Sequence, residues 1–324
     1  MFACKTTYFS FKRQEAKRLV RFSYFRHPFQ NLMSILANLP LTQIKIQIAK
    51  ILYLWVTLFT GKKRRIIKRN GITYEVDIQE GLDLSLYLFG NFQKHVSENQ
   101  FILLPKTATI IDVGANFGLM SLNYAKTYSE GQVYAFEPTH YALEKLKRNL
   151  ELNAEFSKRI RVTNSFISSE VNETPDIKAY SSWKVDGSID DNKHGTHGGT
   201  AKPTDGVGSI TLDAFCKKNN IDKIDFVKID TDGHELEILK GAKGVIENYK
   251  PIIIFEIGIY VMVERGIDFS SYSDYFSSIS YRMFNSLNGK EITLENYKNH
   301  IPQKGTIDIL AVHKEKMGIT TLGN

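Results

Sequence analysis

The sequence is poor in cysteine, and this excludes two kinds of structural site. Its two cysteines, Cys4 and Cys216, stand far apart in a chain of 324 residues. That spacing provides neither a disulfide framework nor a cysteine-based zinc site. A reducing compartment is therefore the default expectation, and we expect a cytoplasmic protein.

The sequence also lacks an apolar run of the length that a membrane span needs, which is roughly 20 residues. The most apolar segment covers residues 44–60, but Lys45 and Lys50 interrupt it. Its longest uncharged run extends only from Ile51 to Gly61. The first residues show no signal-peptide pattern, because repeated Lys and Arg interrupt any apolar stretch. We therefore expect no transmembrane helix.

Acidic residues are almost missing from the first 70 residues. This region has 15 Lys and Arg but one acid, Glu15, which gives a net charge of +14. Of the chain's 42 bases and 35 acids, 27 and 34 remain, so the rest carries −7. Residues 1–69 are therefore expected to meet an anionic surface. We favour peripheral contact with the inner face of a membrane over nucleic acid, because apolar residues interleave with the charges and no nucleic-acid-binding motif is present. A solvated basic helix pair is the structural alternative.

Seven apolar residues near the end of this basic region recur at helical spacing and predict a helix with one apolar face. That face either lies among lipid headgroups beside the basic run Lys62–Arg65 or packs on the main domain, and packing is slightly favoured. The seven residues are Ile44, Ile48, Ile51, Leu52, Trp55, Leu58 and Phe59.

The order of patterns predicts three parts. Residues 1–61 form a basic helical arm, with breaks at Pro28 and Pro40. Residues 62–105 form a connecting unit, with a β-hairpin around Asn70-Gly71 followed by a helix over 82–92. Residues 106–316 form the main domain.

In the main domain, short apolar runs alternate with helical patterns, which is typical of an α/β fold with a mostly parallel sheet. The segment 168–209 is rich in Ser, Gly, Asp and His and shows little periodicity, as functional loops do. Seven strands are predicted, at 109–113, 132–136, 161–167, 225–230, 251–257, 281–286 and 306–313.

The turn after the first of these strands reads DVGANFG over residues 112–118. The strand delivers Asp112 to the carboxyl edge of the sheet, where open α/β sheets bind ligands. Gly114 permits a tight turn, and Gly118 permits a close approach to the start of the helix. Asn116 stands where a dinucleotide-binding turn carries glycine, and this argues against NAD.

The second strand ends at an acid, Glu137, about 20 residues after the glycine turn. A carboxylate there accepts two hydrogen bonds from the vicinal hydroxyls of a ribose. An ordinary surface acid is the alternative. The expected cofactor-binding residues are therefore Asp112, Gly114, Asn116, Gly118 and Glu137.

Three blocks of the chain together resemble the FkbM-type methyltransferases. They cover 112–125, 131–153 and 211–256, and the third contains VKIDTDGHE and ends in PIIIFE. The resemblance implies a Rossmann-like class I methyltransferase fold with S-adenosylmethionine as methyl donor. It also implies O-methylation of a hydroxyl on a sugar or a secondary metabolite. The family commonly has Asp-Val-Glu-Gly where residues 230–233 read DTDG, so the acid at Asp232 is one carbon shorter.

A hydroxyl is a weak acid, so methylating it needs a general base or a metal ion. Asp230 ends the fourth strand and Glu256 the fifth, at the edge where acceptor and methyl group should meet. We predict that one of these two carboxylates acts as the base or orients the acceptor. Asp232 and Glu235 are equally well explained as capping acids at a helix start.

Two histidines, His194 and His197, lie in the glycine-rich loop. A metal site is disfavoured there, because His-x-x-His in such a loop lacks helical geometry and further ligands. A polar lid over the acceptor is favoured. His197 is the third candidate catalytic residue, since imidazole titrates near neutrality.

Four functions remain in order of preference. The first is methylation of a sugar, glycan or glycolipid precursor, which is a step of polysaccharide biosynthesis. The second is methylation of a soluble secondary metabolite. An RNA methyltransferase is third, disfavoured by the acidic main body, and a non-catalytic nucleotide-binding module is last, disfavoured by the intact turn and Glu137.

Overall fold

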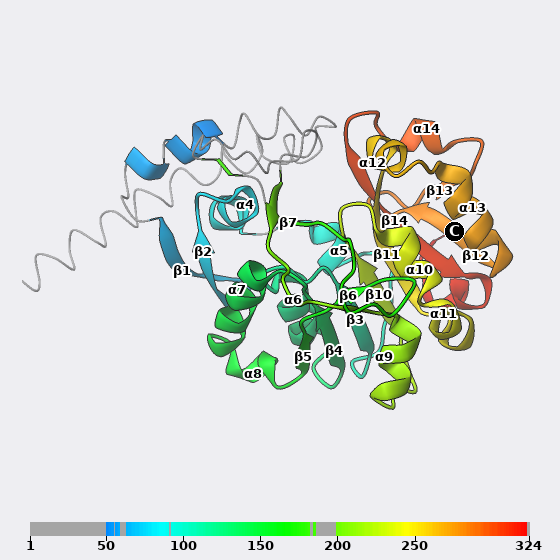
Figure 1. The fold of residues 1–324 in the computed structure, drawn as a ribbon, viewed down its shortest axis with the longest axis horizontal. Helices are drawn as coiled ribbons and strands as arrows, with labels where there is room; N and C mark the ends of the chain where they lie inside the picture. Colours follow the sequence, from blue (N-terminus) through cyan, green and yellow to red (C-terminus); the bar gives the residue numbers. More distant parts are fainter. Residues whose placement is uncertain are drawn as a thin grey trace, which may run out of the picture. The chain divides into compact units, whose positions relative to one another are not determined.

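The computed structural model describes residues 50–54, 56–58, 63–90, 92–181, 184–185 and 199–322. All of them fall in one compact unit, residues 40–324. An eight-stranded sheet runs through this unit, with helices on both faces (Figure 1). In the part of the chain that is described, no helix has the length and apolar character of a membrane span.

The order of strands in the sheet is β13-β12-β14-β11-β10-β3-β4-β5. The pairs within β11-β10-β3-β4-β5 are parallel, whereas β14 is antiparallel to its two neighbours, β11 and β12. This confirms the α/β prediction and the Rossmann-like class I methyltransferase arrangement. The strands are β3 (Thr109–Val113), β4 (Gln132–Phe136), β5 (Ile160–Thr163), β10 (Phe226–Ile229), β11 (Ile252–Gly258), β12 (Tyr281–Asn285), β13 (Glu291–Ile292) and β14 (Thr306–His313).

The helices connect these strands, and three short two-stranded sheets complete the fold. The helices are α4 (Gly81–Phe89), α5 (Lys94–Ser97), α6 (Leu119–Thr127), α7 (His140–Glu151), α8 (Ala154–Ser157), α9 (Leu212–Lys218), α10 (Glu235–Lys240), α11 (Lys243–Tyr249), α12 (Ile259–Glu264), α13 (Phe269–Ser278), α14 (Tyr297–His300) and the 3-10 helix η1 (Lys314–Ile319). The small sheets pair β1 (Arg64–Arg69) with β2 (Ile72–Asp77), β6 (Phe166–Ile167) with β9 (Ser209–Ile210), and β7 (Ala179–Ser181) with β8 (Thr200–Lys202).

The third predicted strand, 161–167, is two strands instead of one. β5 ends at Thr163, and β6 leaves the main sheet to pair with β9. Asn164 and Ser165 cause the break, because their side chains bond to backbone carbonyls. Asn164 donates to Glu137 O, and Ser165 donates to Gly208 O. The main sheet also has an eighth strand, β13, which was not predicted.

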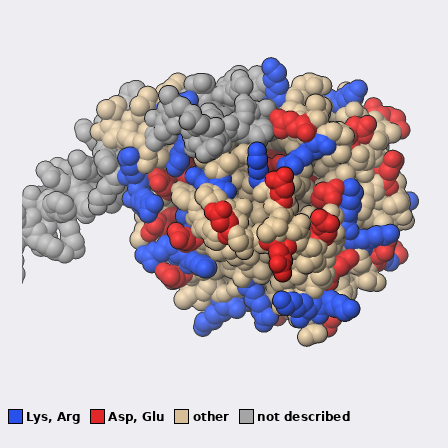
Figure 2. Space-filling model, viewed as in Figure 1, with Lys and Arg blue, Asp and Glu red and all other residues tan. Residues whose placement is uncertain are grey.

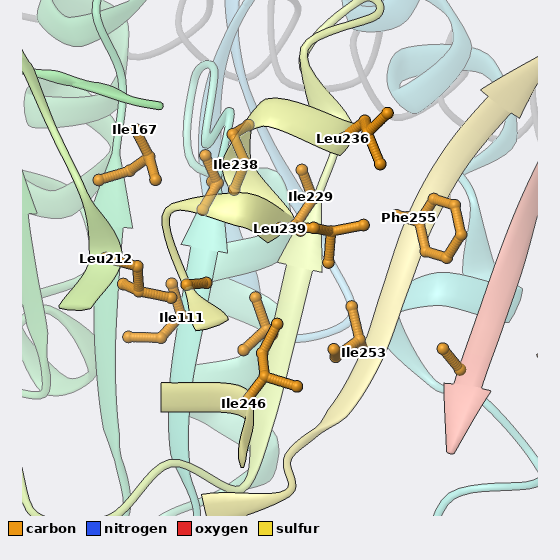
Figure 3. Packing of buried hydrophobic residues seen from close by; sticks show 14 of the residues in the cluster. Ile111, Ile167, Leu212, Ile229, Leu236, Ile238, Leu239, Ile246, Ile253 and Phe255 are labelled. Atoms are coloured by element: carbon orange, nitrogen blue, oxygen red, sulfur yellow. The ribbon is translucent and has the colours of Figure 1, made fainter. Parts of the chain in front are cut away.

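Two apolar layers cover the faces of the sheet. Alternate residues of each central strand point to opposite faces, so Ile111 and Ile110 enter different clusters. Figure 3 shows the first layer, where Leu236 and Leu239 of α10 pack toward Phe255 and Ile253 of β11. The second layer contains α6, α7 and the β1–β2 hairpin. Polar residues follow directly where β4 and β10 end, at Glu137 and Asp230.

The predicted hairpin is confirmed at its turn. Asn70 and Gly71 both have positive φ, 48° and 78°, as a two-residue turn between twisted strands requires. The outward-facing N–H groups of β2 do not bond to another strand. They donate instead to side chains: Thr73 to Asn153, Glu75 to Asn149, and Asp77 to Asp83.

A short helix precedes the hairpin, because residues 50–54 and 56–58 are helical. Tyr53 and Val56 are buried against Ile78, Leu84 and Val185, so this side of the helix packs mostly on the connecting unit, and Val185 is its contact in the main domain. The predicted face is partly wrong, however. Ile51 and Leu58, which were expected on the packed face, are 56% and 80% exposed. Within that stripe, Ile44, Ile48, Trp55 and Phe59 lie outside the described residues.

Candidate active site

Asp112 is the residue before the last in β3 and is completely buried. One of its oxygens accepts a hydrogen bond of 2.5 Å from Ser121 Oγ at the start of α6. The other lies 3.4 Å from the ammonium of Lys228 on β10. Both oxygens thus face protein groups, and Asp112 braces the turn between β3 and α6.

The two glycines of the turn are required by protein packing. A Cβ on Gly114, where φ is +75°, would lie 1.9 Å from the carbonyl oxygen of Asp230. A Cβ on Gly118 would lie 2.8 Å from Leu146 of α7. Asn116 also takes a positive φ, 50°, in which asparagine is tolerated better than most residues. The turn therefore sits tightly against the end of β10 and against α7.

Glu137 follows β4 and is buried beside the turn. Its carboxylate accepts hydrogen bonds from Asn116 N (2.8 Å), Thr139 N (2.9 Å) and Thr139 Oγ1 (2.6 Å). Burial raises the pKa of Glu137, and these hydrogen bonds oppose the rise. A carboxylate has about four acceptor sites, so Glu137 keeps one for a ligand hydroxyl.

Lys228 lies in the middle of the site and is buried. Its ammonium donates to the carbonyls of Gly114 (2.9 Å) and Val113 (3.3 Å) and lies 3.7 Å from Asp230. Burial lowers the pKa of Lys228, but Asp112 and Asp230 outweigh that effect, and the net pKa is raised. Lys228 thus joins the glycine turn to the end of β10 as a charged group.

Asp230 directly follows β10, and 31% of its side chain is exposed. Burial nevertheless raises its pKa, Asp308 and Asp112 add to the rise, and Lys228 opposes it. About a third of the side chain remains accessible to solvent. Asp230 is therefore available to a ligand at the carboxyl edge of the sheet.

Asp232 and Glu235 have different roles in the next turn. Glu235 is buried and accepts from Thr231 N, Thr231 Oγ1 and Gly233 N, so it holds the entrance to α10. Asp232 has a positive φ of 54°. Burial raises the pKa of Asp232 to about 8, and the carboxylates of Asp230, Glu235 and Glu137 contribute. Glu235 thus has a structural role at the start of α10, whereas Asp232 lies close enough to Glu137 for that carboxylate to raise its pKa.

Glu256 on β11 pairs in register with Asp308 on β14, and this places two acids side by side. Glu256 accepts a hydrogen bond of 2.6 Å from Thr306 Oγ1. Burial raises its pKa well above the ordinary value, and Asp230 and Asp308 raise it further. Its surroundings therefore favour the neutral form of Glu256.

Asp308 has a second partner, which the sequence did not reveal. His95 Nε2 of α5 lies 2.7 Å from Asp308 Oδ2, and 30% of the histidine side chain is exposed. A histidine held by a carboxylate in this way is a common proton acceptor in enzymes. The structure thus brings together Asp230, Glu256, Asp308 and His95 at the carboxyl edge.

Neither His95 nor Lys228 was predicted as a functional residue. Lys228 had a visible signal, because it is the one charged residue in the apolar strand FVKI. His95 had none, since its partner lies 213 positions away in the sequence. The third predicted catalytic residue, His197, lies outside the described residues, as does His194.

Lys184, in the segment 168–209, contacts a cluster of charged residues on α7 and around the start of α4. Lys184 lies 2.9 Å from Glu80, which also accepts a hydrogen bond of 2.5 Å from Tyr141. Lys145 of α7 lies 2.7 Å from Asp83. Because Lys145 also stands over the ring of Phe117 in the glycine turn, this cluster borders the predicted cofactor site.

The groups at the carboxyl edge suit the methyl donor that the sequence predicts. S-adenosylmethionine carries a sulfonium cation, an ammonium group and a ribose. Even without Asp232 and Glu256, whose pKa values are raised most, the acids of the edge (Asp112, Glu137, Asp230 and Asp308) outnumber its buried cation, Lys228. Such an excess favours a cationic ligand. Among the residues that the structure describes, no three side chains are placed to hold a metal ion.

Comparison with known proteins gives the family. The model of the FkbM methyltransferase domain matches residues 112–283, more than half of the chain. Methyltransferase sdnD of Sordaria araneosa is 28% identical over 165 residues, which are 43% of this chain and 62% of that protein. Hexuronic acid methyltransferase AglP of Haloferax volcanii is 24% identical over 143 residues, 44% of this chain and 53% of that protein.

The matches thus span less than two thirds of the length of each of these two relatives. Among solved structures, the FkbM methyltransferase from Methylobacillus flagellatus is 18% identical with a TM-score of 0.44, covering 70% of this chain and 52% of that one. The family model spans the glycine turn, Glu137, Lys228, Asp230 and Glu256. The chain therefore belongs to the FkbM methyltransferase family, and its methyl donor is S-adenosylmethionine.

Proposed function

We propose that the protein O-methylates a hydroxyl group of a sugar, a glycan or a glycolipid precursor. The observation that carries the proposal is the His95–Asp308 pair, which stands with Asp230 at the carboxyl edge. A hydroxyl acceptor needs such a proton acceptor, whereas a more nucleophilic acceptor does not. The similarity to a hexuronic acid methyltransferase supports an acceptor of the sugar class.

The ends of β3 and β4, here called the cofactor half, would hold the methyl donor. Glu137 has one acceptor site left for a ribose hydroxyl, and the turn at 112–118 is held ready by Asp112 and Lys228. When bound, the sulfonium supplies a methyl group that is already activated. The remaining task of the protein is to align the acceptor and remove its proton.

The ends of β10 and β11 with the start of β14, here called the acceptor half, would do this. If His95 donates from Nε2 to Asp308, its Nδ1 is the nitrogen that accepts the proton of the hydroxyl. Asp308 then stabilises the imidazolium that forms. Asp230 orients the acceptor through a hydrogen bond. Glu256 lies opposite Asp308 and is assigned to hydrogen-bond donation, because burial and the neighbouring acids raise its pKa and favour its neutral form.

The acceptor class is tested by comparing cells that contain or lack the gene. Glycans and polar lipids are profiled by mass spectrometry, and in cells that lack the gene we expect one species to be lighter by the mass of one CH2 unit, because a hydrogen then stands in place of the methyl group. The purified protein should restore that species when S-adenosylmethionine is added to the extract. If the change appears only among soluble metabolites, or only in RNA, the sugar proposal is wrong.

The cofactor half is tested separately by isothermal titration with S-adenosylhomocysteine. We expect Glu137→Ala to weaken binding by about 1.5–3 kcal/mol, as loss of hydrogen bonds to a charged group does. Glu144→Ala is the matched control, because it removes an exposed acid from α7, the helix that follows Glu137 in the sequence. Equal affinity of the Glu137 variant and the wild type would show that Glu137 does not bind the ribose.

A further inference from the structure

The helix at residues 50–58 is apolar on two sides. Its inner side, Tyr53 and Val56, is buried mostly against the connecting unit. Ile51, Leu54 and Leu58 follow at spacings of three and four residues, so they share one side of the helix. Their exposed fractions are 56%, 60% and 80%. A surface helix normally carries mostly polar residues on its solvent side. Here three large apolar residues are exposed on that side, and Lys50 and Thr57 are the polar residues next to them.

The neighbouring strand β1 gives this apolar side a basic border. Its residues alternate in exposure, so Arg64, Ile66 and Lys68 share the solvent face. Arg64 has a distant ion pair with Asp77, at 3.9 Å. No ion pair of Lys63 or Lys68 occurs in the part of the chain that the structure describes. In Figure 2, Lys and Arg side chains gather over β1 next to the uncharged surface of the helix.

The sequence around this surface has no compensating acid. Between Glu15 and Glu75 there is no Asp or Glu, while the same stretch has 12 Lys and Arg. A partner protein would have to supply an apolar patch bordered by acids. An anionic bilayer provides both an apolar region, its acyl chains, and negative groups, its headgroups, across its whole surface.

We propose that Ile51, Leu54 and Leu58, together with Arg64, Ile66 and Lys68, form a docking surface for an anionic phospholipid bilayer. The three helix residues enter the headgroup and acyl boundary, and the basic residues of β1 lie at the headgroup phosphates. The surface holds the protein at the membrane without a spanning helix. It also deepens the proposed function, because a glycolipid acceptor would lie in the same bilayer.

The test is co-sedimentation of the full chain with phosphatidylcholine vesicles that contain or lack phosphatidylglycerol. The wild type should bind only the anionic vesicles, and salt should weaken the binding. Leu54→Glu should lower the partition coefficient by about tenfold or more, because it places a charge in the apolar boundary. Lys68→Glu should lower it by about fivefold or more.

Leu103→Glu is the matched control, since Leu103 is 63% exposed and belongs to neither element. It should bind as the wild type does. If the wild type ignores anionic vesicles, or if Leu54→Glu and Leu103→Glu bind equally well, the proposal is overturned. A wild-type dimer that Leu54→Glu converts to a monomer would assign the surface to a second copy of the chain instead. None of these results depends on S-adenosylhomocysteine binding, which tests the enzyme itself.

Discussion

The cofactor half and the acceptor half both present carboxylates at the same edge of the sheet, but they hold them differently. In the cofactor half, the hydrogen bonds of Asp112 and Glu137 join groups within 21 positions in the sequence, and the one distant partner is Lys228, which pairs with Asp112. In the acceptor half, Glu256 and Asp308 depend on partners 50 and 213 positions away. The first arrangement is local and constant, as a fixed cofactor needs. The second depends on how distant segments pack, and there acceptor specificity can change without altering the cofactor half.

The largest expected effect separates the two halves. His95→Ala should lower the rate of methyl transfer by about 10²–10⁴-fold, the usual contribution of a general base. Affinity for S-adenosylhomocysteine should stay unchanged, because His95 touches only the acceptor half. Asp308→Asn should cause a smaller loss of rate, since it removes orientation and leaves the base. A loss of cofactor affinity in His95→Ala would show that the two halves are not independent.

Lys228 joins the halves, so its removal should affect both. Lys228→Met leaves Asp112 and Asp230 desolvated without their cation, and we expect a loss of about 3–5 kcal/mol in the free energy of unfolding. Urea denaturation measures this loss. Lys223→Met, which breaks an ion pair at a half-exposed lysine, should cost at most about 1 kcal/mol. Equal losses for the two variants would contradict the role of Lys228.

The contact between the glycine turn and β10 should be sensitive to a single methyl group. Gly114→Ala places Cβ against Asp230 O at a positive φ, and about 2–4 kcal/mol of stability should be lost. Gly206→Ala has a similar φ, +73°, but no atom within 4 Å. It should cost only about 1 kcal/mol, the strain of the backbone alone. The difference between their melting curves isolates the contact.

The smallest effect concerns pH. Because the pKa of Asp232 is raised to about 8, folding disfavours its ionised form, and stability is lost as pH rises from about 4 to 8. Asp232→Asn mimics the neutral acid, so it should stabilise the protein by about 1–2 kcal/mol at pH 8, less than the full shift because the side chain is partly exposed. The gain should vanish near pH 4. Equal stabilisation at both pH values would mean that Asp232 is not desolvated.

The contrast between the halves also explains what the sequence could predict. Strands β3, β4 and β14 have the predicted bounds, because short apolar runs and the glycine turn are local signals. No helix was predicted over residues 259–278, where α12 and α13 lie, because no comparable local signal marks this region. In the site, Asp112 and Glu256 lie near the ends of strands, and Glu137 and Asp230 directly follow strands, so their position alone allowed us to predict them as candidates. His95 reaches Asp308 only through the packing of α5 on the finished sheet, and no local pattern records that contact.

The bonded outer edge of β2 has a consequence for the protein in solution. An edge strand with unoccupied donors invites another chain to add a strand, which is a common route to aggregation. Here the outward N–H groups of Thr73, Glu75 and Asp77 are already taken by side chains of α4, α7 and the residues after it. The hairpin can therefore expose β1 to a charged surface while β2 offers no template to a neighbouring molecule.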